Sequence, residues 1–162
     1  MEAISLFITG GTLDKVYNET LGELTFHNTH LAEMLGQARS SINIELQELM
    51  LVDSLEMSSS QRTHIVTQCK KTTNLKIIIT HGTDTMVHTA AEIAKENLQK
   101  TIVITGAMIP YKVNNSDSLF NLGSSLAFVQ TLPIGVYIVM NGECFHWNDV
   151  RKNKSLGVFE NL

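Results

Sequence analysis

The chain has 162 residues, of which 43% are hydrophobic and 17% are charged, and its formal net charge is -4. That length suits one domain with its own core, because a chain of this size buries about 70% of its unfolded surface. The negative balance argues against a nucleic-acid surface or an anionic membrane as partner, which leaves a small neutral or zwitterionic ligand.

The predicted elements alternate along the chain. A strand over residues 3–9 precedes a helix with apolar residues at helical spacing over 31–38, and a second strand covers 42–52. A capping-box pattern at 58–61 opens the next helix. The later elements are, in chain order, a strand over 75–80, a helix from 84 through 98, a strand over 101–105, a helix over 119–129 and a strand over 134–140. This alternation predicts an α/β fold, a single-domain three-layer sandwich in which helices cover a mainly parallel, doubly wound sheet.

Two short polar turns follow predicted strands, at residues 9–12 (Thr-Gly-Gly-Thr) and 81–85 (His-Gly-Thr-Asp-Thr). Because the carboxyl ends of strands form the ligand crevice of an open α/β sheet, we expect both turns to converge on one polar site. The two glycines would present successive backbone amides to an anion, and the Thr12 hydroxyl becomes a nucleophile if a neighbour accepts its proton. Thr83 and Asp84 are candidates for a proton relay, and a desolvated lysine is the usual base that such a site needs.

Several other classes of site are excluded or disfavoured. The common phosphate-binding and serine-hydrolase motifs are missing, and the six histidines show no metal-ligand spacing. Cys69 and Cys144 are interpreted as two reduced thiols. The chain enters its first strand without a basic leader segment, so we expect a cytoplasmic protein with no metal or cofactor and no membrane or nucleic-acid partner.

Four ordered motifs resemble the bacterial-type L-asparaginases and glutaminase-asparaginases. They are residues 9–14, 81–90, 106–108 and 149–152, and segments 52–57 and 116–122 also look like family segments. The resemblance implies the fold of the family's N-terminal domain. It also implies hydrolysis of L-asparagine, with L-glutamine or another small amide as alternatives, to the acid and ammonia through an acyl-threonine intermediate.

The resemblance implies specific catalytic roles. Thr12 matches the family nucleophile. Thr83, Asp84 and Lys152 match the second triad, in which the lysine and the aspartate set the protonation of the threonine hydroxyl. Tyr17 lies roughly where a mobile active-site loop of the family carries a tyrosine.

The resemblance also implies substrate-binding positions. Ser54 would hold the α-carboxylate of the substrate, and Asp84 would contact its α-amino group. Ala107 and the amide of Thr83 correspond to positions near the developing oxyanion, and Gly11 is a further expected substrate-binding residue.

Each residue taken alone has a simpler interpretation. Asp84 alone is more typical of a helix N-cap, Thr12 of a turn and Lys152 of a solvated surface charge. Ser54 is as well explained as a loop hydroxyl, and Tyr17 is better explained as a structural residue. Only the joint pattern favours catalysis.

The chain also departs from the family that it resembles. Family members continue into a C-terminal domain, and a glutamate from a neighbouring subunit's C-terminal domain binds the substrate's amino group. We therefore expect residues 1–162 to form a single domain without the C-terminal one, to be weakly active, and to cover the crevice as a homodimer. Two alternatives stay open: a catalytically silent domain that binds a small amino acid or serves as an interaction module, and the ammonia-releasing subunit of an amidotransferase.

Overall fold

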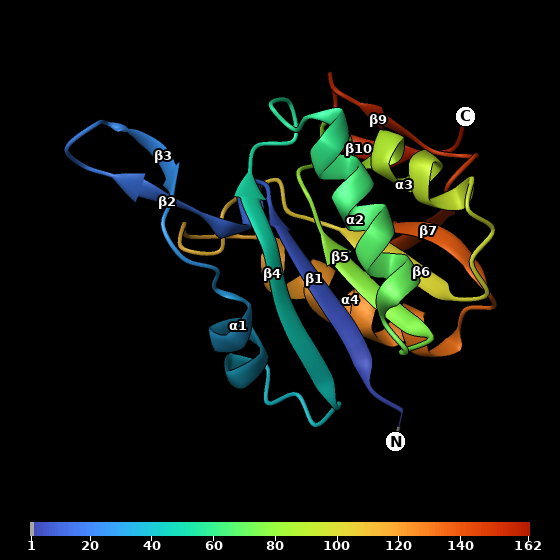
Figure 1. Cartoon of the computed structure of the whole chain (residues 1–162). Coiled ribbons are helices and arrows are strands. Elements are labelled where there is room, and N and C mark those ends of the chain that lie inside the picture. The colour runs from blue at the N-terminus through green and yellow to red at the C-terminus, as the bar shows by residue number, and fades with distance from the viewer. Residues whose placement is uncertain (1) are drawn as a thin grey trace.

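A six-stranded sheet forms the centre of the computed structural model, which describes residues 2–162 (Figure 1). Its order is β4-β1-β5-β6-β7-β8, in which the first five strands are parallel and β8 is antiparallel to β7. The bounds are β1 (Ile4–Gly10), β4 (Ile44–Val52), β5 (Lys76–Thr80), β6 (Thr101–Thr105), β7 (Gly135–Met140) and β8 (Glu143–His146). The predicted α/β fold with a mainly parallel sheet is confirmed.

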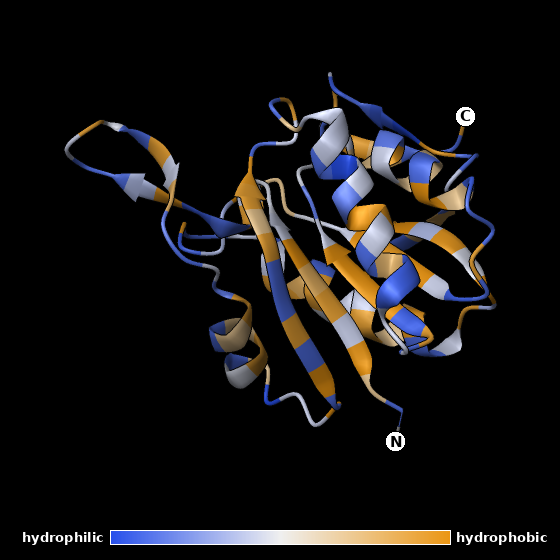
Figure 2. Ribbon diagram, viewed as in Figure 1, coloured by the Kyte–Doolittle hydropathy of each residue, from blue (hydrophilic) through white to orange (hydrophobic). Residues whose placement is uncertain are grey.

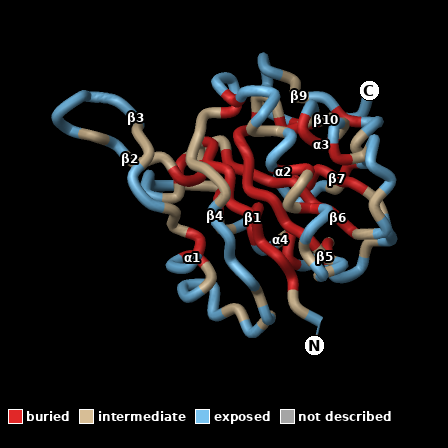
Figure 3. The backbone as a smooth tube through the Cα atoms, viewed as in Figure 1, coloured by how far each residue is buried: buried red, intermediate tan, exposed pale blue. Residues whose placement is uncertain are grey.

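Four helices cover the two faces of this sheet. They are α1 (Leu31–Gln37), α2 (Ser59–Lys71), α3 (Met86–Ala94) and α4 (Ser118–Thr131). Alternate residues of β5 enter opposite hydrophobic clusters, with Ile77 in the cluster of α2 and α3 and Ile78 in the cluster of α1 and α4. Both faces are therefore buried, which explains why the central strands carry no polar stripe and appear red in Figure 3.

The outer strand β4 differs from the central strands because, within residues 2–162, only β1 pairs with it. Its residues 44–47 alternate between apolar and polar, and Figure 2 shows hydrophilic bands between hydrophobic ones along this strand. Residues 45–48 are exposed, and the charges of Glu45 and Glu48 disfavour pairing of this edge with another chain.

Two hairpins were not predicted. Strands β2 (Lys15–Asn18) and β3 (Glu23–Phe26) form a hairpin that projects from the body (Figure 1), and β9 (Arg151–Asn153) pairs with β10 (Val158–Glu160). Strand β8 was also missed. The missed strands have three or four residues each, which is too short for a hydrophobic period to be recognised.

The start and the end of α3 correct the prediction. The helix ends at Ala94 rather than near Leu98, and Asn97 has a φ of 48°, a left-handed conformation that does not continue a helix. Thr85 occupies the N-cap position, but no side chain makes a capping hydrogen bond there. The interpretation of Asp84 as a helix cap is therefore wrong. Its carboxylate has a different partner, which is described below.

Candidate active site

Three loops meet at the carboxyl ends of neighbouring strands β4, β1 and β5. A methyl group added at Gly11 would overlap the backbone of Gly82, and one added at Gly82 would overlap the side chain of Ser54. The three loops are therefore packed at the distance of backbone contact, which only glycine permits at these positions. Thr12 and Thr83 each directly follow one of the two contacting glycines. The predicted convergence of the two polar turns is confirmed.

The backbone of Gly11 combines a φ of 76° with a ψ of -178°, a region that only glycine occupies without strain. Its amide donates to Val52 O at 2.9 Å, across the irregular end of the β1–β4 pairing. The expectation that both glycine amides would face an anion is therefore wrong for Gly11. This residue lines the crevice by letting the loops approach closely.

Replacing Gly11 by alanine should destabilise the protein. Strained backbone and overlap with the Gly82 backbone act together, and we expect a loss of about 2–4 kcal/mol in the free energy of unfolding. Urea denaturation measures it. The matched control is Gly123→Ala, because Gly123 is exposed in α4 with open space around it, and alanine there should stabilise by about 0.5–1 kcal/mol. Equal stability of Gly11→Ala and wild type would contradict the packing described.

Lys152 reaches the turn after β5 from the C-terminal hairpin. Its Nζ donates to Thr83 Oγ1 at 2.7 Å and to Asp84 Oδ1 at 2.8 Å. The Lys152 side chain is only 12% exposed, whereas that of Asp84 is 34% exposed. An amine held on a hydroxyl and a carboxylate in this way is not a solvated surface charge, so the simpler interpretation of Lys152 is wrong.

Apolar contacts hold the hairpin that carries Lys152. Phe159 lies directly opposite Lys152 across the β9–β10 pair, and it is buried together with Val150. Both side chains belong to the hydrophobic cluster that includes Met86 of α3. The hairpin is therefore fixed to the helix that begins just after Asp84.

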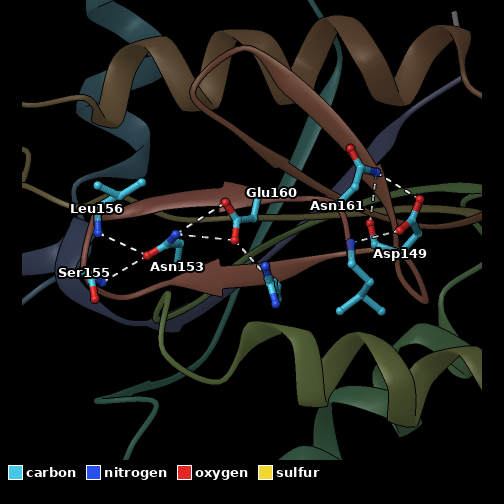
Figure 4. Close-up of polar contacts among 8 residues, drawn as sticks. Asp149, Asn153, Ser155, Leu156, Glu160 and Asn161 are labelled. Carbon is cyan, nitrogen blue, oxygen red and sulfur yellow. Dashed lines mark hydrogen bonds and ion pairs between the residues drawn. The ribbon is translucent and has the colours of Figure 1, made fainter.

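Polar contacts fix the same hairpin at both ends (Figure 4). Asn153 Oδ1 accepts hydrogen bonds from the backbone amides of residues 155 and 156, each at 3.2 Å, which closes the turn. At the base, Asn161 Nδ2 donates to Asp149 Oδ2 at 2.9 Å. The backbone at residues 149–153 therefore has little freedom to move Lys152 away from the crevice.

Thr12 begins the short 3-10 turn η1 (Thr12–Asp14) and is half-buried. The turn is tied down by Asp14, whose carboxylate accepts from His30 N at 2.8 Å and from Thr29 Oγ1 at 3.1 Å. Burial raises the pKa of Asp14 to about 6 from an ordinary 3.8. The position of Thr12 thus depends on a carboxyl group that is itself sensitive to pH.

Ionisation of Asp14 should lower stability between about pH 4 and pH 6. The folded state keeps the proton in this interval and the unfolded state releases it, so the stabilisation from protonated Asp14 is complete below pH 3.8 and lost as pH rises through 6. At 1.36 kcal/mol per unit the loss is about 3 kcal/mol. Asp14→Asn keeps the acceptor for His30 but cannot ionise, so its stability relative to wild type should rise with pH across this interval in urea titrations. A pH-independent difference would contradict the prediction.

Of the remaining predicted site residues, some lie at the crevice and others do not. Ser54 is buried beside Gly82, at the end of β4. Ala107 is fully buried in the hydrophobic cluster of α1 and α4, so its methyl group faces the core and only its backbone is available to the crevice. Tyr17 lies on the projecting β2–β3 hairpin with 64% exposure. The structure therefore brings Gly11, Ser54, Thr83, Asp84 and Lys152 together but leaves Tyr17 apart from them.

The described residues hold no group of three or more histidine, cysteine or acidic side chains that could bind a metal ion. No helix within residues 2–162 has the length and apolar character needed to cross a membrane. The polar side chains joined by hydrogen bonds at the turn after β5 are the Thr83 hydroxyl, the Asp84 carboxylate and the Lys152 amine.

Comparison with known proteins shows to which protein family the chain belongs. The family model described as "Asparaginase, N-terminal" matches residues 3–159. The chain belongs to the asparaginase family. The resemblance inferred from the four motifs is confirmed.

Other asparaginase-family proteins resemble the chain in sequence and in structure. L-asparaginase 2 of Escherichia coli strain K12 is 30% identical over 96% of this chain and 47% of its own length. The probable periplasmic L-asparaginase of Haemophilus influenzae is 27% identical over 96% of this chain and 47% of its own length. The solved structure of the thermostable L-asparaginase from Thermococcus kodakarensis superimposes with a TM-score of 0.87 and 26% identity, covering 99% of this chain and 51% of that one. The chain thus spans about half the length of these relatives.

An ion pair that the sequence did not predict joins two of the crevice loops of this asparaginase-family chain. Lys15 Nζ lies 2.5 Å from Asp53 Oδ2, next to Ser54. The hydrogen bond from Lys15 keeps the pKa of Asp53 below its usual value. The two residues are 38 positions apart, and no spacing signal relates them. This ion pair holds the segment that follows Thr12 close to the turn that contains Ser54.

Proposed function

We propose that the chain is an asparaginase-type amidohydrolase that converts L-asparagine to aspartate and ammonia through a threonine ester. The observation that carries the proposal is the position of Lys152 Nζ, 2.7 Å from Thr83 Oγ1 and 2.8 Å from Asp84 Oδ1. Proton transfer requires donors and acceptors within hydrogen-bond distance of each other, and this continuous set of hydroxyl, amine and carboxylate meets that requirement. Membership of the asparaginase family and relatives named L-asparaginase support the same reaction.

The proposed first step forms an ester on Thr12. The Thr12 oxygen attacks the side-chain carbonyl carbon of asparagine, and the carbonyl π electrons move to oxygen. The Thr12 hydroxyl proton moves to Thr83 Oγ1 as Thr83 passes its own proton to Lys152 Nζ and Lys152 passes one to Asp84 Oδ1, so the proton gained is held on Asp84. Collapse of the tetrahedral species returns the electrons, breaks the carbon–nitrogen bond and releases ammonia after its nitrogen has gained that proton. Water then cleaves the ester by the same route, which frees aspartate and restores the Thr12 hydroxyl.

The substrate would be held by groups around the same crevice. We assign the Ser54 hydroxyl to the α-carboxylate and the Asp84 carboxylate to the α-ammonium group. The backbone at Thr83 and at Ala107 would stabilise the oxyanion, because fixed peptide dipoles in a shielded site favour a developing negative charge. Gly11 would line the crevice at the point where the loops pack closely. Tyr17 would approach the substrate when the β2–β3 hairpin moves.

We further propose that residues 1–162 work as one domain in a homodimer that covers the crevice. Exposed apolar side chains near the crevice support its coverage by a second copy of the chain. Leu55, beside Ser54, is 67% exposed, and Leu156, in the β9–β10 turn, is 71% exposed. The native mass with and without L-asparagine tests this assembly. A reducing compartment such as the cytoplasm suits the two free thiols, Cys69 and Cys144.

Ammonia release by the purified chain tests the proposed function directly. We expect a low but measurable rate with L-asparagine, and L-glutamine as a second substrate in the same assay gives the preference. Inertness of the wild type, together with a rise in melting temperature on addition of L-asparagine, would replace hydrolysis by ligand binding alone.

A further inference from the structure

The guanidinium group of Arg62 lies between α2 and α3, next to the loops that form the crevice. Arg62 Nη1 donates to Thr89 Oγ1 at 2.8 Å, and its Nη2 donates to Thr85 Oγ1 at 3.2 Å. Arg62 lies in the first turns of α2, whereas both threonines lie at the start of α3. One planar fork therefore holds two hydroxyls of the neighbouring helix in a fixed relation, which a lysine could not do.

The first arm of this fork leads to the turn of Ser54. The Thr85 hydroxyl donates its only proton to Ser54 O at 2.9 Å, so its lone pairs are free to accept from Arg62. Thr85 also directly follows Asp84. Arg62 thus acts through Thr85 on the backbone of the residue assigned to the α-carboxylate.

The second arm leads to the turn of Thr83 through a buried imidazole. His81 Nδ1 lies 2.9 Å from Gly82 O, and its Nε2 lies 2.8 Å from Thr89 Oγ1. A carbonyl only accepts, so Nδ1 carries the proton and Nε2 accepts from the Thr89 hydroxyl. Burial lowers the pKa of His81 to about 4, which keeps the ring neutral and this pattern of donors fixed near pH 7.

We propose that Arg62 is a positioning residue that holds the Ser54 turn and the Thr83–Asp84 turn in register with each other. This role rests on the proposed function, because it sets the distance between the group that binds the α-carboxylate and the groups that move the proton. The guanidinium touches neither the substrate nor the reacting atoms. Its effect is transmitted by the two threonine hydroxyls.

Kinetics of Arg62→Met test the role. We expect the KM for L-asparagine to rise about 10-fold and kcat to fall less, because a misplaced binding group weakens substrate orientation. The KM for 3-aminopropanamide, which has no α-carboxylate, should change little. Arg62→Lys should give an intermediate KM. Lys70→Met is the matched control, since Lys70 is also a cation of α2 with an ion pair to Glu96, and its kinetics should equal those of wild type.

A second variant separates the arms of the network. Thr85→Val removes the first arm, with its bonds to Arg62 and to Ser54 O, and leaves the Thr89 arm intact. It should raise the KM nearly as much as Arg62→Met, and the double variant should be little worse than either one. Additive effects of the two substitutions on KM would overturn the proposed transmission through Thr85.

Hydrogen exchange gives a readout that does not need turnover. The amides of Leu55 and His81, which donate to Asp53 Oδ1 at 3.0 Å and to Thr105 O at 2.8 Å, should lose protection together in Arg62→Met and keep it in Lys70→Met. Unchanged protection in either turn, or an unchanged KM in Arg62→Met while the wild type is active, overturns the proposal. A wild type that releases no ammonia but shows the coupled loss of protection contradicts the proposed function and leaves the positioning of the two turns supported.

Discussion

Replacing Thr12 by alanine should abolish ammonia release from L-asparagine. In the proposed mechanism the substitution removes the oxygen that would form the ester, and the loss of a nucleophile costs at least about 1,000-fold in kcat. The side chain is half-buried at the start of a turn whose position is fixed by Asp14, so the fold should remain. A coupled ammonia assay measures the rate, and thermal unfolding measures the stability, which should change by about 1 kcal/mol or less.

Thr12→Ser is the matched control for this substitution. Serine keeps the oxygen and removes only a methyl group, so part of the activity should survive. Full activity of Thr12→Ala would assign the nucleophile to another group. Equal inactivity of Thr12→Ala and Thr12→Ser would show that the methyl group is required too, and would contradict the expectation that the oxygen alone preserves part of the activity.

Lys152→Met should reduce kcat by at least about 100-fold, the usual range for loss of a group that transfers a proton in the transition state. Methionine has a similar length but cannot donate to Thr83 or pair with Asp84. Stability should fall by about 1–3 kcal/mol because two polar groups lose their partner. The rate with L-asparagine and the midpoint of urea unfolding check the two effects separately.

Lys154→Met provides the control for a change of charge on the same hairpin. Lys154 is exposed two residues beyond Lys152, and its substitution should leave both the rate and the stability near wild type. Loss of activity in both variants would point to a general electrostatic effect. Retained activity in Lys152→Met would remove the amine from the mechanism.

The sheet and the meeting of its loops could be predicted from sequence because their signals are local. Uninterrupted apolar runs identified β5 and β6, and the capping box at 58–61 correctly marked the start of α2. The position of polar turns after parallel strands then predicted one crevice, since strand ends in a parallel sheet share an edge.

Contacts between distant segments could not be predicted in the same way. Thr83 and Lys152 are 69 positions apart, and their contact depends on a three-residue strand that no periodicity reveals. The family resemblance alone indicated that the amine belongs to the site. The ion pair of Lys15 and Asp53 and the Arg62 network carried no comparable signal, because isolated charged residues are most often solvated.

The role of Asp84 shows why a local rule failed. An aspartate between a strand and a helix is commonly an N-cap, but here the nearby Lys152 ammonium offers a stronger, charged partner than the backbone amides of α3. Tertiary contact therefore decided the orientation of this carboxylate.

Mass spectrometry of the protein quenched with acid during turnover of L-asparagine tests the central claim most directly. The account predicts a substrate-derived ester on the peptide that contains Thr12, present in wild type and missing in Thr12→Ala. An adduct on any other residue, or sustained ammonia release with no adduct on Thr12 under conditions that trap the ester, would contradict it.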